Sequence, residues 1–222
     1  HRDLHLSLRR QRQMCIRDRH IRDDEEKLPL LRSMSEIAGT SALLIASEYL
    51  SNINMGKGLI LGGITGVSPT DVVIIGAGTV GEYACKTAIG LGANVRVFDT
   101  SLSRLKRLED ISNRNISTSI ILPKSLRKAL RRADVVVGAL RSGDGRTPCV
   151  VSEEMIKNMK EGSVIIDVSI DSGGCFETSE VTSHKNPVFT KHGVIHYCVP
   201  NIASRVARTS SFAICNVISP LL

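Results

Sequence analysis

The chain has 222 residues, 42% of them hydrophobic, and no apolar run that approaches the ~20 residues of a membrane-spanning helix. The charged N-terminal sequence does not resemble a secretory signal, so a cytoplasmic protein is the default expectation. The net charge of +7 is concentrated in residues 1–22, where seven Arg and two Asp give +5, so no nucleic-acid partner is expected for the folded body.

Residues 1–27 form a basic tail that contains no Phe, Tyr or Trp for base stacking. Its segment QMCIRDR resembles translated adapter sequence. We therefore expect this tail to be non-native or disordered, and we exclude it from the fold.

Ordered sequence is predicted to begin near Ser33, where SMSE matches a capping box between Ser33 and Glu36. The stretch that follows, IAGTSALLIASEYLSNI, suits a helix because its apolar residues fall on one broad face. The glycine-rich LILGGITGVSP then predicts a tight hairpin or a closely packed strand.

Beyond this point, short β-branched runs alternate with helical stretches. The predicted strands are DVVIIGAG, NVRVFD, STSIIL, DVVVGAL, SVIIDVS and VIHYCVPN. The predicted helices are TVGEYACKTAIGLG, SLSRLKRLEDI, PKSLRKALRRA, SEEMIKNMK and RTSSFAICNVISPLL. This alternation predicts a doubly wound α/β fold of Rossmann type, with a parallel sheet, a domain over residues 28–204 and a terminal helix over 205–222.

A glycine motif of the form G-x-G-x-x-G lies between the first predicted strand of this series and its helix. It consists of Gly76, Ala77, Gly78, Thr79, Val80 and Gly81. In this context the motif predicts a site for the pyrophosphate of a dinucleotide, held by backbone N–H groups at the helix N-terminus.

An acidic residue, Asp99, ends the next predicted strand, 18 residues after the last glycine of the motif. At this position a carboxylate binds the adenine ribose hydroxyls and repels a 2′-phosphate, so the sequence predicts NAD as the cofactor. Arg104 lies five residues further on, where it would stack beside the adenine or attract a phosphate.

With the glycine motif placed, five segments together resemble the alanine dehydrogenase family, over about residues 28–222. They are LLRSMSEIAG, LGGITGV, VVIIGAGTVGEYACKTAIGLGANVRVFD, GSVIIDVSIDSGGCFETS and VIHYCVPNIASRVARTSSFAICN. The resemblance implies an oxidoreductase that converts L-alanine, NAD and water to pyruvate, ammonia and NADH. The alternative is a close relative, the NAD-binding module of proton-translocating transhydrogenase, which carries out no amino-acid chemistry.

The resemblance also assigns site residues. It implies that the glycine motif holds the pyrophosphate, that Asp99 binds the ribose and that Asp171 is a catalytic group. It adds six cofactor-binding positions, which are Ser35, Arg104, Leu140, Ile170, Val199 and Asn201. From spacing alone, Asp171 is about as well explained by an Asx-turn into Ser172 and Gly173, whereas Asp167 is assigned to structure.

The resemblance further implies that this chain is a fragment, because the family's catalytic histidine and substrate-clamping residues lie in a domain that precedes LLRSMSEIAG. We therefore expect the chain to bind NAD, to turn over little or no alanine, and to form a homo-oligomer through the helix near Ser33. No metal site is expected, since the spacing of His196 and Cys198 matches no familiar ligand set.

Overall fold

The computed structural model describes residues 28–54, 56–113, 115–141 and 145–219, so the prediction for residues 1–27 lies outside the described chain. Seven strands form one sheet in the order β3-β2-β1-β4-β5-β7-β6. The strands are β1 (Asp71–Ile75), β2 (Asn94–Asp99), β3 (Ser117–Ile120), β4 (Val135–Gly138), β5 (Val164–Asp167), β6 (Val188–Lys191) and β7 (Val194–Tyr197). All neighbours pair in parallel except β6 and β7. The predicted doubly wound α/β fold is confirmed.

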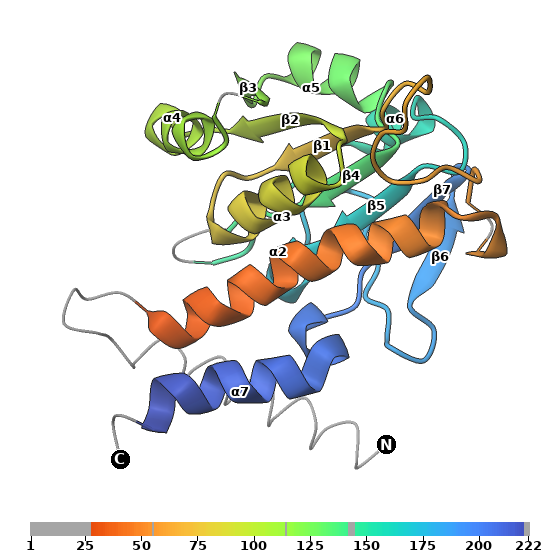
Figure 1. Cartoon of the computed structure of the whole chain (residues 1–222). Coiled ribbons are helices and arrows are strands. Elements are labelled where there is room, and N and C mark those ends of the chain that lie inside the picture. The colour runs from red at the N-terminus through yellow and green to blue at the C-terminus, as the bar shows by residue number, and fades with distance from the viewer. Residues whose placement is uncertain (1–27, 55, 114, 142–144, 220–222) are drawn as a thin grey trace.

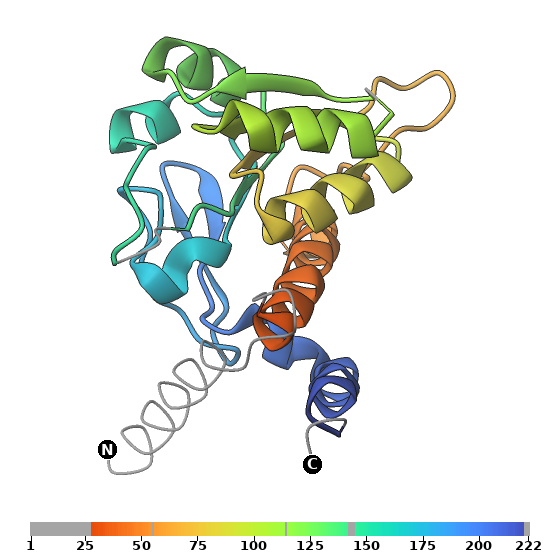
Figure 2. The ribbon, with the colours of Figure 1, turned by 90° about the vertical axis from the view of Figure 1, so that its left-hand side faces the viewer.

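Helices cover both faces of this sheet (Figures 1 and 2). One face carries α2 (Pro29–Leu50), α3 (Thr79–Gly90) and α4 (Leu102–Ile111), and the other carries α5 (Pro123–Leu130) and α6 (Glu153–Lys157). The last helix, α7 (Ala207–Ile218), runs beside α2 (Figure 1). Three short 3₁₀ helices connect these elements, η1 (Asn52–Asn54), η2 (Val168–Ser172) and η3 (Ile202–Val206).

The central strands are apolar on both sides because each face packs against a helical layer. In β1, Val72 and Ile74 join the core under α2 and α3, whereas Val73 and Ile75 join the core under α5 and α6. Such continuous Val and Ile runs are what made these strands predictable from sequence.

The predicted capping box at Ser33 is wrong. Helix α2 begins at Pro29, and the Ser33 hydroxyl lies inside the helix, where it donates to the Pro29 carbonyl at 3.0 Å. Proline is well suited to a first helical position, because its missing N–H would have no acceptor there. This start lies one turn earlier than the local Ser33–Glu36 motif indicates.

An edge strand was not predicted. β6 pairs antiparallel with β7 through a tight turn at His192 and Gly193, whose φ angles are +54° and +73°. For LILGGITGVSP the sequence left a tight hairpin or a closely packed strand open, and the structure forms a tight turn closed by a single antiparallel bridge, in which the Val67 N–H donates to the Ile64 carbonyl at 2.9 Å. Over the described ranges, no helix has the length and apolar character required to cross a membrane.

Candidate functional site

The three glycines of the motif serve three different purposes. Gly76 has a φ of +115°, and a Cβ there would lie 2.4 Å from the Ala139 carbonyl oxygen, so the turn after β1 needs glycine. A Cβ on Gly81 would lie 1.8 Å from the Gly76 carbonyl oxygen, so α3 approaches the turn too closely for any side chain. A Cβ on Gly78 would meet no described atom within 4 Å, so this position is open to a ligand.

Helix α3 presents its N-terminus at this open position. Gly78 is its N-cap, and no side chain in the described ranges caps it by a hydrogen bond. The first-turn N–H groups of a helix have no acceptor within the helix, and the helix dipole adds positive potential there. The N-terminus of α3 therefore has the geometry and the polarity of an anion site.

The loop lies where the strand order reverses. β2 and β3 extend to one side of β1, and β4 and β5 extend to the other. In open α/β sheets the crevice outside the carboxyl ends of the strands at this point is where ligands bind. The glycine loop leaves the carboxyl end of β1, and Leu140 follows the neighbouring end of β4.

Asp99 lies beneath the glycine loop and is only 1% exposed. Its Oδ2 accepts a hydrogen bond from the Ala77 N–H at 2.7 Å, and its Oδ1 accepts one from the Ser101 N–H at 2.7 Å. The Arg104 guanidinium lies 3.9 Å from Oδ2. Asp99 thus fixes the loop, a role that sequence spacing did not reveal, while its contact with a ribose stays a prediction.

Ser35 lies on α2 where this helix crosses α3. Gly39, one turn further along α2, packs so closely on α3 that its Cβ would lie 2.3 Å from the Val80 carbonyl oxygen. Because residues four apart share a helix face, Ser35 is directed toward the same end of α3. Ser35 is partly exposed, and its contact with a cofactor stays a prediction.

Asp171 and Asn201, which are 30 positions apart, meet at the carboxyl edge of the sheet. Both oxygens of Asp171 accept from the Asn201 N–H, at 3.1 and 3.3 Å, and Asn201 adopts a left-handed conformation. Asp171 is exposed, yet the chain that surrounds its carboxyl raises the pKa of this group by desolvation, and the Asn201 N–H partly offsets the rise. The Gly173 N–H bonds the Ile170 carbonyl, so the Asx-turn alternative is not what the described structure forms.

The other predicted cofactor contacts surround this pair. Ile170 and Val199 are 6% and 3% exposed, so their side chains pack mainly in the interior, and their contact with a cofactor stays a prediction. Leu140 is partly buried, and its carbonyl accepts from the Ser169 hydroxyl at 2.8 Å. The structure thereby brings β4, the 3₁₀ helix that bears Asp171 and the end of β7 into one cluster.

A buried carboxylate, Asp167, closes the loop that bears Asp171. It accepts from the N–H groups of Ser169 and Cys175, at 3.0 and 3.1 Å, and from the Ser179 hydroxyl at 2.6 Å. Burial raises its pKa to about 6, although these donors act in the opposite direction. Asp167 is therefore structural, in agreement with the sequence-based assignment.

The surroundings of His196 and Cys175 indicate structural roles for both residues. His196 is fully buried between the Thr178 hydroxyl at 2.8 Å and the Val194 carbonyl at 2.9 Å. Burial raises the pKa of the Cys175 thiol well above its usual range, which makes it a poor nucleophile. In the part of the chain that the structure describes, no three His, Cys, Asp or Glu residues are grouped so that they could hold a metal ion.

The strand order, the glycine loop at its reversal point and the acid ending β2 define a dinucleotide-binding domain of the Rossmann class. Residues 42–222 match the family described as alanine dehydrogenase/PNT, C-terminal domain. The chain belongs to this family.

Individual relatives agree with this assignment. The chain is 46% identical over 193 residues to an alanine dehydrogenase of Methanococcus maripaludis, covering 86% of this chain and 52% of the relative. It is 43% identical over 197 residues to one of Staphylococcus haemolyticus, covering 88% and 53%. The chain thus spans about half the length of the curated relatives that it matches.

Solved structures show the same pattern. An L-alanine dehydrogenase superposes with a TM-score of 0.87 at 37% identity, covering 92% of this chain and 56% of that one. A transhydrogenase from Sinorhizobium meliloti superposes with a TM-score of 0.75 at 22% identity, covering 86% and 54%. The second likeness is evidence for the shared fold only.

Proposed function

We propose that this chain is the NAD-binding part of an alanine dehydrogenase, which converts L-alanine, NAD and water to pyruvate, ammonia and NADH. One observation supports this above all. A glycine loop suited to a pyrophosphate and the Asp171–Asn201 pair lie at the same edge of the sheet, in a chain 46% identical to an alanine dehydrogenase.

The residues fit the cofactor. The open position at Gly78 and the N–H groups of α3 suit the pyrophosphate, and Asp99 and Arg104 would then lie on the adenosine side. Leu140, Asp171 and Asn201 would then border the nicotinamide. When bound, NAD supplies the hydride acceptor for the oxidation of the alanine Cα.

Asp171 is suited to proton transfer at this edge. Its raised pKa makes the carboxylate a stronger base than an ordinary Asp, and the Asn201 N–H fixes its orientation. In the proposed reaction it would take a proton from the substrate amine or from the attacking water.

A cytoplasmic location and a homo-oligomeric state are further parts of the proposal. Leu44 on α2 is 56% exposed and Phe212 on α7 is 60% exposed, so apolar surface lies on two adjacent helices outside the core. A second copy of the chain would cover it. The transhydrogenase alternative has less support, because its likeness extends to the fold alone.

The proposal predicts that Asp171→Asn removes activity without removing cofactor binding. The substrate-binding half of the Methanococcus maripaludis relative would be joined ahead of Leu28, and NADH formation from L-alanine followed by absorbance. We expect Asp171→Asn to lower the rate by about 100-fold or more, since proton transfer contributes factors of this size. NADH affinity should change by less than about threefold, because the amide oxygen still accepts from the Asn201 N–H.

Asp110→Asn is the matched control, because Asp110 lies on the exposed side of α4, where its carboxylate pairs with Lys106 at 2.7 Å. The catalytic assignment would be contradicted if both fusions bind NADH and the Asp171→Asn fusion oxidises L-alanine at the same rate as the fusion without the substitution.

A further inference from the structure

The peptide groups of Ala77, in the middle of the glycine loop, are held from both sides. On one side the Ala77 N–H donates to Asp99 at 2.7 Å. On the other side Arg107, from α4, donates through Nη2 to the Ala77 carbonyl at 3.3 Å. The loop is therefore tied to the end of β2 and to the helix that follows it.

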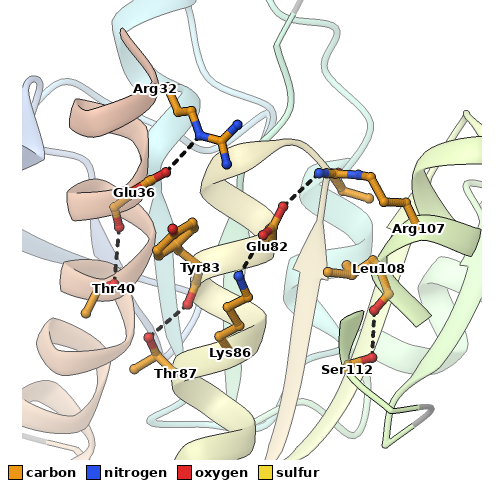
Figure 3. A network of polar contacts seen from close by, with 11 residues as sticks. Arg32, Glu36, Thr40, Glu82, Tyr83, Lys86, Thr87, Arg107, Leu108 and Ser112 are labelled. Atoms are coloured by element: carbon orange, nitrogen blue, oxygen red, sulfur yellow. Dashed lines mark hydrogen bonds and ion pairs between the residues drawn. The ribbon is translucent and has the colours of Figure 1, made fainter. Parts of the chain in front are cut away.

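Arg107 is itself held by Glu82 on α3 (Figure 3). Its Nη1 lies 2.9 Å from Glu82 Oε2, while Lys86 Nζ lies 2.7 Å from Oε1. Glu82 is only 5% exposed, whereas Arg107 is about half exposed. The planar guanidinium bridges a carboxylate and a carbonyl from two separate nitrogens held in a rigid fork, and the single ammonium nitrogen of a lysine does not reproduce this geometry.

The pairing also controls charge at the anion site. Glu82 lies in the first turn of α3, where its negative charge on its own would compete with a phosphate for the helix N-terminus. Burial alone would raise the pKa of Glu82, but the ion pairs with Lys86 and Arg107 outweigh burial and lower the pKa. The carboxylate is therefore ionised, and the two cations balance its negative charge. Without Arg107, the buried Glu82 carboxylate would keep the ion pair with Lys86 and lose the other of the two ion pairs described here.

We propose that the Glu82–Arg107 pair positions the glycine loop for dinucleotide binding. The pair acts on the Ala77 carbonyl and not on the ligand, so Arg107 is a positioning residue. This inference rests on the proposed NAD-binding function. It assigns part of the positioning of the loop to two residues, Glu82 and Arg107, that do not belong to the G-x-G-x-x-G motif.

The test compares Arg107→Met with Lys106→Met in the full chain. Lys106 is the neighbouring cation on α4, and it pairs with Asp110 on the exposed side. We expect Arg107→Met to weaken NADH and ADP-ribose binding about tenfold. We also expect it to accelerate hydrogen exchange at the Ala77 amide, measured by NMR, whereas Lys106→Met should change neither quantity.

The exchange measurement separates the two proposals. If the wild-type chain binds no NADH, the proposed function fails, and exchange at Ala77 still decides whether Arg107 holds the loop. Unchanged exchange and unchanged affinity in Arg107→Met would overturn the inference. If Arg107→Met does not fold, Arg107→Lys is tested in its place. The lysine keeps the positive charge but lacks the two-nitrogen fork of the guanidinium. Partial loss of affinity in Arg107→Lys supports positioning, and full wild-type affinity overturns it.

Discussion

Gly81→Ala is expected to abolish dinucleotide binding and to destabilise the chain by about 3 kcal/mol, the upper end of the usual cost of overpacking. The added Cβ would lie 1.8 Å from the carbonyl oxygen of Gly76 and 2.9 Å from its carbon. Both atoms belong to the backbone, so no rotamer change relieves the contact. α3 would have to move away from β1, and the loop geometry would be lost with it.

Chemical denaturation followed by circular dichroism measures this effect. Gly90→Ala is the control on the same helix, because a Cβ there meets no described atom within 4 Å. It should be neutral or stabilising by about 0.4–1 kcal/mol. A Gly81→Ala chain as stable as wild type would show that α3 and the turn after β1 are not packed as closely as described.

Asp167→Ala is expected to have a comparably large effect, because it removes the acceptor of three donors. Two of these are the buried backbone N–H groups of Ser169 and Cys175, and the third is the partly buried Ser179 hydroxyl. A buried donor left without a partner costs about 1–3 kcal/mol, so we expect a loss of about 3 kcal/mol at neutral pH. The loop that bears Asp171 should open, and NADH affinity should fall with it.

The same substitution has a pH signature. The pKa of Asp167 is about 6 in the folded chain, above its ordinary value of 3.8, so the folded state holds the proton more tightly than the unfolded state. The proton-linked part of its contribution to stability is therefore fully present below pH 3.8 and is lost as pH rises through 6. This part corresponds to about 3 kcal/mol, and it adds to the cost of the unpaired N–H groups, which applies at both pH values. We expect the destabilisation by Asp167→Ala, measured by urea unfolding, to be larger at pH 4 than at pH 7.

Asp110→Ala serves as the control, because Asp110 is more than half exposed. Its effect should be small and nearly the same at the two pH values. Equal destabilisation by Asp167→Ala at pH 4 and pH 7 would contradict the raised pKa of the buried carboxylate.

Most of the sheet was predictable because its signals are local. The runs VVII, VVVG and VIID are apolar on both faces, and glycines bound the helix α3. β6 was missed because its residues, Val188–Lys191, are only partly buried or exposed at the sheet edge and lack such a run. The start of α2 was misplaced because a local capping motif at Ser33 competed with Pro29, whose effect is stronger.

The candidate site was predictable only in part. The G-x-G-x-x-G spacing located the loop, and the resemblance to a family located Asp171 and Asn201. No spacing in the sequence relates Arg107 to Ala77 or Glu82, because these contacts depend on how α4 packs beside α3. The buried position of Asp99 likewise follows from the tertiary structure and not from the motif.

The most direct test of the central claim is an NADH titration of the full chain and of Gly78→Ala. The chain contains no Trp, so the emission of NADH itself is the signal. A Cβ at Gly78 has open space and should leave stability unchanged, but it would enter the space needed by the pyrophosphate. We predict saturable binding by the wild type and at least about tenfold weaker binding by Gly78→Ala. A folded wild-type chain that binds no NADH, or a Gly78→Ala chain with wild-type affinity, would contradict the account.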